Sequence, residues 1–420
     1  MKLRNQTLTV VDIGTWKTCV LIADVHPETG NPHIKGYGTV ETKGLKRGVV
    51  VNIEELSRTI SEAINAAESM AGTSVSQCYV SISGDHIRSM NTQGTVAITR
   101  DVRGSVGEAQ EIEQEDIDRV IEHTRAVPLP VDRQILHVMP QEFVVDEQSG
   151  IKNPINLLGR RLEARVHITT YSTTVASNLR RCFKNIGLTV NTFILQSLAS
   201  SISVLTPSER EAGAILIDIG AGTTDVIVYA DDGIHHTGVV NFGDQLVTSD
   251  IAYLLRIPHE NAETIKKNHG YSFTKNVDRE AVIKIDSIGN RPARELPLLK
   301  LAEFIEPRME EILREAFMES KKADVPFTSI QSVVLTGGGA LLKGCEELAE
   351  SIFSMPARIG FPTNYSGFED ELNNPKYSAA IGMIQFALQE KLQDRIKPTG
   401  SGSWLSKTWN WLKNLTENIM

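Results

Sequence analysis

Cysteine is scarce in this sequence, and its placement excludes two kinds of structural site. The 420 residues include four cysteines, and no two of them form a C-x-x-C pair. A disulfide framework or a zinc site is therefore not expected, and a reducing compartment suits the chain. The four are Cys19, Cys78, Cys182 and Cys345.

Membrane-spanning runs and excess positive charge are lacking as well. No stretch reaches the roughly 20 apolar residues that cross a bilayer, and the first residues contain no apolar core of signal-peptide length. The 43 basic residues are outnumbered by 52 acidic ones, which gives a formal net charge of −9. This balance argues against a general nucleic-acid binder. We expect a soluble protein with no nucleic acid among its partners.

The length and composition are those of an ordinary globular protein with more than one lobe. A chain of 420 residues is too long for one compact core. Hydrophobic residues make up 41% of it and charged residues 23%, which is typical of globular domains.

One short pattern occurs twice in the chain. The first copy, TVVDIGTWKTCVLIADV, occupies residues 9–25, and the second, LIDIGAGTTDVIVYADD, occupies residues 216–232. In both copies an apolar strand ends in Asp-Ile-Gly, small and hydroxyl residues follow, and a second apolar strand begins. Either copy alone is most simply a β-hairpin with a Gly turn. Two copies at matching positions favour one task shared by two halves of the chain.

The turn residues of both copies are suited to phosphate groups. Gly lets the backbone turn tightly so that N–H groups converge on an anion, and Thr hydroxyls add hydrogen bonds. The carboxylates of Asp12 and Asp218 can hold a hydrated Mg²⁺. Two such hairpins facing each other would hold a nucleoside triphosphate from both sides. The candidates are Asp12, Gly14, Thr15, Trp16 and Lys17 in the first copy and Asp218, Gly220, Ala221, Gly222, Thr223 and Thr224 in the second.

A glycine-rich segment supports this interpretation. SVVLTGGGALLKG, residues 332–344, contains an apolar strand, then Gly337, Gly338 and Gly339, then an apolar run that begins a helix. Glycines let the backbone lie against a ribose or a flat ring, and the N-terminus of the following helix favours negative charge.

The order of these elements resembles the actin, Hsp70 and sugar-kinase superfamily, in which two related lobes close over ATP. The resemblance implies that Glu263 and Lys266, in AETIKK, contact the adenosine, although a solvated helix face explains their spacing equally well. It also implies two helices between the lobes, LQSLASSISVL (residues 195–205) and YSAAIGMIQFAL (residues 377–388).

A segment within the first half narrows the resemblance. Residues 85–164 have strands and an acidic helix of their own, and we expect an inserted α+β subdomain because the flanking QCYVSIS and EARVHITTY are expected to be strands of the parent lobe. The run from Ile135 to Thr170, with LIDIGAGTTD, GDQLVTSDIA and LTGGGA, resembles the FtsA family of bacterial actin-like cell division proteins along nearly the whole chain.

We therefore predict an α/β, actin-like two-lobed ATPase fold with an inserted subdomain and a C-terminal amphipathic helix. The expected divisions are a first-lobe core of 1–84, 165–195 and 365–392, an inserted subdomain of 85–164, a second-lobe core of 196–243 and 302–364, a small second-lobe subdomain of 244–301, a flexible linker of 393–402, and a membrane-targeting helix of 403–420.

Catalysis is expected to be slow if it occurs. In the superfamily an acidic or amide residue often stands at the position of Gln196 and helps to place the attacking water. The candidate catalytic residues of this chain are therefore Gln196 and Asp218. Gln can orient water but is a poor base. A polar residue at a helix interface is an equally good interpretation of Gln196. We expect at most a slow ATPase that is mainly an ATP-dependent assembly protein.

The C-terminal segment has the pattern of a membrane-surface helix. QDRIKPTGSGS has the composition of a flexible linker, and SWLSKTWNWLKNLTENIM places its apolar residues on one side of a helix. Trp suits the headgroup boundary and lysines favour anionic lipid. A last helix docked on the protein body is the alternative. The membrane candidates are Trp404, Leu405, Lys407, Trp409, Trp411, Leu412, Lys413 and Leu415.

The resemblance to FtsA proteins implies a role at the division septum. It implies a peripheral protein on the cytoplasmic face of the cell membrane that polymerises, binds the FtsZ C-terminal peptide through residues 244–301, and recruits FtsN and other divisome proteins through residues 85–164. ATP and Mg²⁺ are the implied cofactors. A PilM-like peptide-binding assembly module and a small-molecule kinase of the superfamily are alternatives, and an Hsp70-type chaperone would need a β-rich substrate domain that does not follow here.

Overall fold

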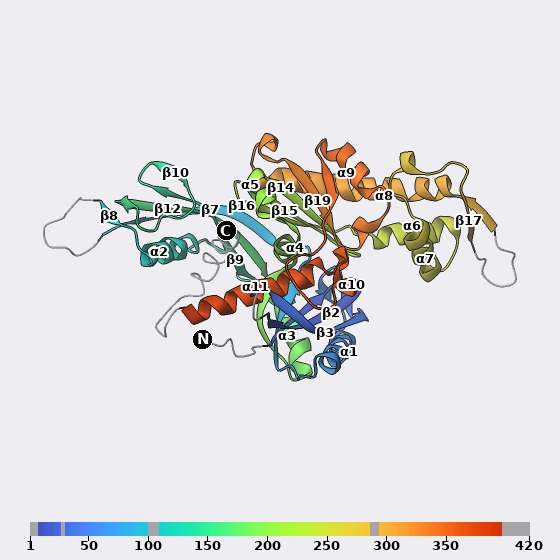
Figure 1. Ribbon diagram of the computed structural model, residues 1–420, viewed down its shortest axis with the longest axis horizontal. Helices are drawn as coiled ribbons and strands as arrows, with labels where there is room; N and C mark the ends of the chain where they lie inside the picture. Colours follow the sequence, from blue (N-terminus) through green and yellow to red (C-terminus); the bar gives the residue numbers. More distant parts are fainter. Residues whose placement is uncertain (1–6, 27–29, 100–108, 286–293, 397–420) are drawn as a thin grey trace.

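The structure is a computed structural model that describes residues 7–26, 30–99, 109–285 and 294–396. Two lobes lie against each other, and a subdomain projects from each end of the molecule (Figure 1). The prediction of an actin-like α/β fold with an inserted subdomain is confirmed.

A five-stranded sheet forms the core of the first lobe. Its strands, in spatial order, are β13 (Thr189–Leu195), β6 (Gln77–Ile82), β1 (Leu8–Ile13), β2 (Lys17–Val25) and β3 (Pro32–Glu41). Helix α1 (Ile53–Ala71) packs closely on β3. The helix is so near that a Cβ on Gly38 would lie 2.0 Å from the carbonyl oxygen of Ala63, and the absence of a side chain at Gly38 allows this packing. Helix α3 (Thr173–Asn185) leads into β13.

The second lobe repeats this sheet. Its strands, in spatial order, are β16 (Gly233–Val240), β15 (Thr224–Ala230), β14 (Ala214–Ile219), β19 (Ser332–Thr336) and β20 (Ala357–Ile359). In both lobes the first hairpin is antiparallel, the third strand of the chain pairs antiparallel with the second, and two later strands are parallel additions. Helices α5 (Pro207–Ala212), α8 (Leu298–Ser320) and α9 (Cys345–Phe353) complete the lobe. The repeated sequence pattern is therefore a repeated fold.

Two helices cross between the lobes, as the small residues in them predict. They are α4 (Gln196–Val204) and α11 (Ser378–Ile396). Gly382 of α11 lies so close to α4 that a Cβ would be 1.7 Å from the carbonyl oxygen of Ala199. The hydroxyl of Ser203 donates to the carbonyl of Ser378 at 2.7 Å. A short helix, α10 (Glu369–Leu372), precedes α11.

The inserted subdomain has a sheet and an apolar core of its own. The sheet order is β10 (Gln148–Ile151), β9 (Arg133–Val145), β12 (Arg161–Ser172) and β7 (Arg88–Ala97), and α2 (Gln114–Thr124) packs on it. Strands β8 (Gln110–Glu111) and β11 (Leu158–Gly159) form a small second ladder.

The prediction that EARVHITTY is a strand of the parent lobe is wrong. These residues lie in β12, which pairs along its length with β7 and β9 of the inserted sheet. The subdomain therefore extends past the expected boundary at 164. An alternating strand shows a buried face in either sheet, and only its long-range partners decide between them.

Polar contacts join the inserted subdomain to the second lobe. The His167 ring shares hydrogen bonds with Asn91 at 2.7 Å and with the hydroxyl of Thr237 at 2.9 Å. The hydroxyl of Ser89 donates to the carbonyl of Thr237 at 2.7 Å. Burial lowers the pKa of His167 to about 3, so its ring is neutral at pH 7.

The small subdomain of the second lobe lies at the other end of the molecule (Figure 1). It contains α6 (Gln245–Leu255), α7 (His259–His269) and the ladder of β17 (Val282–Ile285) with β18 (Arg294–Pro297). The boundary expected after residue 301 falls inside α8, which continues from the small subdomain into the lobe core.

At the C-terminal end α11 continues to Ile396, so the first four residues of the expected linker are helical. The predicted helix of 403–420 and its membrane candidates lie outside the described residues. In the part of the chain that is described, no helix has both the length and the apolar composition that a membrane crossing needs.

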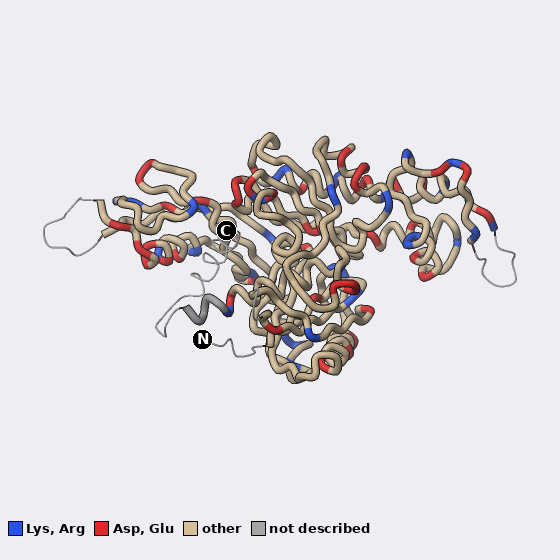
Figure 2. The backbone as a smooth tube through the Cα atoms, viewed as in Figure 1, with Lys and Arg blue, Asp and Glu red and all other residues tan. Residues whose placement is uncertain are grey.

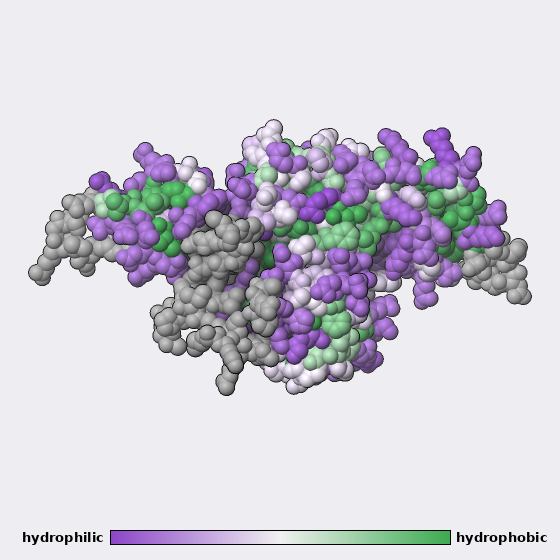
Figure 3. All heavy atoms as spheres, in the orientation of Figure 1, coloured by the Kyte–Doolittle hydropathy of each residue, from purple (hydrophilic) through white to green (hydrophobic). Residues whose placement is uncertain are grey.

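Charged residues of both signs and apolar side chains share the surface of the molecule. Acidic and basic residues are interspersed over both lobes (Figure 2), and α8 pairs Arg314 with Glu310 along its own surface. Apolar surface is visible at both projecting ends, and also over the middle of the molecule (Figure 3). At the projecting ends the exposed apolar side chains include Leu157 and Leu158 in the inserted subdomain and Tyr253, Leu254 and Val282 in the small subdomain.

Candidate functional site

The two repeated hairpins close in the same way. The N–H of Gly14 donates to the carbonyl of Lys17, and the N–H of Gly220 donates to the carbonyl of Thr223, each at 3.0 Å. A Cβ on Gly220 would lie 2.9 Å from the Thr223 carbonyl oxygen, so the turn is too tight for a side chain. Asp12 and Asp218 stand at equivalent positions, one residue before the end of β1 and of β14.

The tips of the hairpins meet between the lobes. A Cβ built on Gly222 would lie 2.4 Å from the hydroxyl oxygen of Thr15, so the two turns touch. Each lobe therefore contributes one turn to the same site, as the repeat predicts.

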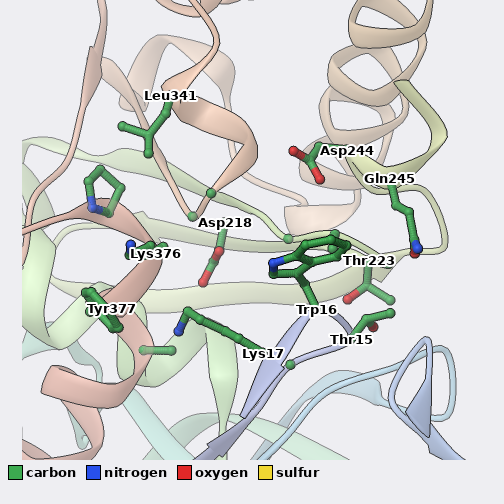
Figure 4. A pocket seen from close by; sticks show the side chains of 18 of the residues that line it. Thr15, Trp16, Lys17, Asp218, Thr223, Asp244, Gln245, Leu341, Lys376 and Tyr377 are labelled. Carbon is green, nitrogen blue, oxygen red and sulfur yellow. The ribbon is translucent and has the colours of Figure 1, made fainter. Parts of the chain in front are cut away.

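A cavity of about 620 Å³ opens around these turns. Its lining comes from both hairpins, α7, the loop after β19 and the start of α11 (Figure 4). The predicted residues that line it are Asp12, Gly14, Thr15, Trp16, Lys17, Gln196, Asp218, Gly220, Ala221, Gly222, Thr223, Glu263, Lys266, Gly337 and Gly338.

Two predicted residues do not line the cavity. Thr224 is fully buried in β15, and its hydroxyl donates to the carbonyl of Phe242 at 2.9 Å. Gly339 packs beneath the loop, where a Cβ would lie 2.4 Å from the side chain of Ile219. Successive residues of an extended segment face opposite ways, so Thr224 turns away from the cavity that Thr223 lines.

Two buried carboxyl groups lie on the floor of the cavity. Burial raises the pKa of Asp12, and the Lys17 ammonium, 3.9 Å away, opposes this rise. Burial also raises the pKa of Asp218 to about 6, against hydrogen bonds from Gln196 and from Ser200 at 2.6 Å. The Oδ1 atom of Asp12 is buried and has no hydrogen-bond partner. The floor is therefore suited to accept a cation or a water held by one.

Asp225 and Ser83 are functional candidates that the sequence analysis did not single out. Ser83 follows β6 in the first lobe, and its hydroxyl donates to Asp225 of the second lobe at 2.5 Å. Burial, together with the nearby Asp218 carboxylate, raises the pKa of Asp225 to about 8. Asp225 pairs with Asp218 across the second hairpin, which is the signal that could have identified it.

Helix α7 contributes an ionic cluster to one side of the cavity. The Lys266 ammonium lies 2.7 Å from Asp244 and 2.8 Å from Glu263. Burial raises the pKa of Glu263, but the ammonium and hydrogen bonds to the carboxylate outweigh this effect and lower it to about 2. The cluster holds the polar atoms of α7 toward the cavity.

The glycine loop approaches the floor closely. Gly337 has a φ of 84°, and a Cβ there would lie 2.4 Å from Asp218 Oδ1. Only glycine satisfies both conditions.

Basic residues that the sequence analysis did not name complete the lining. Lys343 follows the glycine loop, and Lys376 lies in the short turn before α11. The Lys17 ammonium also lies 4.6 Å from the centre of the Tyr377 ring. Several ammonium groups thus face one cavity with two buried carboxyl groups.

Family models match both parts of this architecture. The model for cell division protein FtsA matches residues 215–382, and the model for the SHS2 domain inserted in FtsA matches residues 84–170. The FtsA cell division protein of Pseudomonas aeruginosa is 40% identical over 94% of this chain and 92% of its own length. That of Escherichia coli K12 is 35% identical over 96% of each chain.

Solved structures share the fold at low sequence identity. The PilM–PilN type IV pilus biogenesis complex matches with a TM-score of 0.61 and 14% identity, over 91% of this chain and 98% of that one. MreB5 of Spiroplasma citri bound to ADP matches with a TM-score of 0.55 and 12% identity, over 94% and 99%. The fold and the relatives agree: the chain belongs to the FtsA family of actin-like cell division proteins.

Proposed function

We propose that the cavity binds ATP with Mg²⁺ between the two hairpins. The observation that carries this proposal is the repeated turn, closed by the same hydrogen bond in both lobes and meeting at Thr15 and Gly222. N–H groups of such turns bind phosphate oxygens, and the lining ammonium groups favour negative charge. The shared fold with MreB5, which was solved with ADP, supports the assignment.

The nucleotide would extend from the hairpins to the glycine loop. Glu263 and Lys266 would contact the adenosine from α7, and Gly337 and Gly338 would let the backbone approach it. The hairpin turns and Lys17 would hold the phosphates.

Asp12 and Asp218 fit a hydrated Mg²⁺. The unpartnered buried oxygen of Asp12 needs a donor or a cation. In the described part of the chain no three His, Cys, Asp or Glu side chains cluster as a protein-only metal site. This suits Mg²⁺, which binds through a carboxylate or two, waters and substrate phosphates. The metal would neutralise charge on the phosphates.

Hydrolysis would be slow. Gln196 would orient a water by its amide, and Asp218 is held by Gln196 and Ser200 and is close to the proposed metal, so neither is a free general base. The protein would therefore work mainly through the nucleotide-bound state.

Calorimetric titration of the full chain with Mg-ATP tests nucleotide binding. Lys17→Gln is expected to weaken binding at least tenfold, because it removes a charge-assisted contact with phosphate. Lys321→Gln is the matched control, since Lys321 lies over the Phe317 ring and does not line the cavity. Equal affinities for the wild type and Lys17→Gln would contradict the placement of phosphate beside this lysine.

In the cell the protein would connect the division machinery to the membrane. Family membership supports a role in which ATP-dependent filaments bind the FtsZ C-terminal peptide through the small subdomain, and FtsN and other divisome proteins through the inserted subdomain. The exposed apolar side chains at both ends of the molecule are suited to such contacts (Figure 3).

Two surface variants separate these partner sites. Tyr253, 84% exposed, lies in the small subdomain, and Leu158, 68% exposed, lies in the inserted one. Tyr253→Ser is expected to weaken binding of the FtsZ peptide in an anisotropy titration, and Leu158→Ser to weaken FtsN. Val51→Ser is the control, because Val51 is 65% exposed and belongs to the first lobe. A reversed pattern would exchange the two assignments.

The C-terminal segment would attach the protein to anionic lipid on the cytoplasmic face of the membrane. Its Trp and Lys pattern supports an interfacial helix. A chain ending at Ile396 keeps α11 and is expected to lose co-sedimentation with anionic vesicles while it still binds ATP. Vesicle binding by the shortened chain would exclude the segment as the anchor.

A further inference from the structure

Trp16 is a large side chain in a turn that needs none. The two hairpin turns correspond residue by residue, and the position that is Trp16 in the first turn is Gly222 in the second. Phosphate binding by a turn depends on backbone N–H groups, so the second turn performs its part without a side chain here. The indole is 37% exposed at the edge of the cavity. The indole therefore has a role other than binding phosphate through the turn.

The indole reaches the opposite lobe. The Lys267 ammonium, on α7, lies 5.0 Å from the centre of the Trp16 ring, within the range of a cation–π contact. Lys267 is oriented by Glu263, 3.1 Å from its ammonium. Figure 4 shows the Trp16 ring rising from the first-lobe hairpin into the cavity, between Asp218 and Thr223. The Trp16 ring of the first lobe thus contacts the Lys267 ammonium of the second lobe.

This contact lies on a side of the cleft that the inserted subdomain does not cover. That subdomain is at the opposite end of the molecule from α6 and α7 (Figure 1). Opening of the lobes would separate Trp16 from Lys267, because one belongs to β1–β2 and the other to α7.

We propose that Trp16 and Lys267 form a gate across the cleft that slows both entry and release of the nucleoside triphosphate. The inference rests on the proposed binding of ATP in this cavity. With nucleotide bound, the paired indole and Lys267 ammonium lie across the entrance of the cleft and oppose its exit. Without nucleotide, the same contact holds the lobes together at the cleft edge.

A gate differs from an ordinary ligand contact in its kinetics. Removal of a gate raises the association and dissociation rates together and changes Kd less than either rate. Removal of a ligand contact raises the dissociation rate alone. Lys267 also attracts the anion, so its own substitution changes the rates by charge. A double-mutant cycle cancels that effect because it is present in both arms.

Stopped-flow fluorescence with a ribose-labelled ATP analogue and Mg²⁺ measures both rates on the full chain. Trp16→Ala is expected to raise both rates by about two- to fivefold, the range that loss of one exposed cation–π contact gives. In the Lys267→Gln background, Trp16→Ala is expected to have a smaller effect. Lys321→Gln, which removes a cation–π contact with Phe317 outside the cavity, is expected to change neither rate.

The outcomes separate the gate from the binding site. If Trp16→Ala raises only the dissociation rate, Trp16 is a ligand contact and the gate is wrong. Unchanged rates, or equal effects of Trp16→Ala in both backgrounds, also overturn it. If the wild-type chain does not bind the analogue or unlabelled ATP, the proposed function fails and the gate fails with it.

Discussion

Gly382→Ala is expected to destabilise the protein, although the same substitution stabilises most helices. Gly to Ala in a helix interior is ordinarily worth about 1 kcal/mol. Here the new Cβ would lie 1.7 Å from the carbonyl oxygen of Ala199 and 2.5 Å from its carbonyl carbon, whereas real Cβ contacts essentially begin at 3.0 Å. The two helices would have to move apart by more than an ångström where the lobes join.

The steric cost outweighs the gain in helix propensity. Overpacking a core costs about 1–3 kcal/mol, and a backbone atom has no rotamer with which to avoid the clash. Because the clash is with backbone, the cost lies at the upper end of this range, and the expected net loss is up to about 2 kcal/mol in the free energy of unfolding, measured by urea denaturation of the nucleotide-free chain. Gly338→Ala is the control, because Gly338 has φ −65° and ψ −34° with nothing within 4 Å of the new Cβ. It is expected to gain up to about 1 kcal/mol.

A double variant distinguishes a backbone clash from a side-chain clash. Ala199→Gly removes the methyl group of residue 199 but leaves its carbonyl in place, so it is not expected to rescue Gly382→Ala. Full rescue, or a Gly382→Ala protein as stable as the wild type, would refute the close crossing of α4 and α11.

Three further predictions follow from buried charges and a helix cap. Asp225 is protonated in the folded protein up to about pH 8 but ionised above about pH 4 when unfolded, so it reduces stability as pH rises between these values. Asp225→Asn should remove this dependence of stability on pH. In thermal denaturation without nucleotide, the stability of the variant relative to the wild type should grow by on the order of 1 kcal/mol per pH unit from pH 5 to 8. A difference that stays constant over this range would contradict the raised pKa of Asp225. Lys266→Met leaves Asp244 and Glu263 without their shared ammonium and should cost about 3 kcal/mol in urea denaturation, and a neutral result would mean that the cluster contributes no stability. Asn52→Ala removes the side-chain cap of α1 and should cost about 1 kcal/mol by the same assay, whereas no loss would show that water replaces the cap.

The sequence predicts the site best where its chemistry is local. The tight turn at Gly220 is set by its neighbour Thr223, and the bend at Gly337 by its own φ of 84°, so these glycine requirements arise within a few residues and are visible in the chain itself. The small residues of the two segments likewise predict the close crossing of α4 and α11.

Residues that depend on distant partners are not visible in this way. The position of Asp225 opposite Asp218 is visible in the hairpin pattern, but its hydrogen bond from Ser83, which belongs to the other lobe, is not. Lys376 joins the cavity because α11 returns to the first lobe. Thr224 has a hydroxyl group that could bind phosphate, but its position in β15 directs that group away from the cavity, to the carbonyl of Phe242. Strand β12 could belong to either sheet until its partners are known.

In the proposed mechanism, the nucleotide in the cleft controls assembly and, through it, membrane attachment. Vesicle co-sedimentation with anionic lipid tests it most directly, with and without Mg-ATP, for the full chain and for Lys17→Gln. A single interfacial helix binds weakly, and a filament multiplies its hold because later contacts are effectively intramolecular. We expect Mg-ATP to raise the bound fraction of the wild type and to leave that of Lys17→Gln nearly unchanged. A bound fraction of the wild type that is indifferent to Mg-ATP would contradict it.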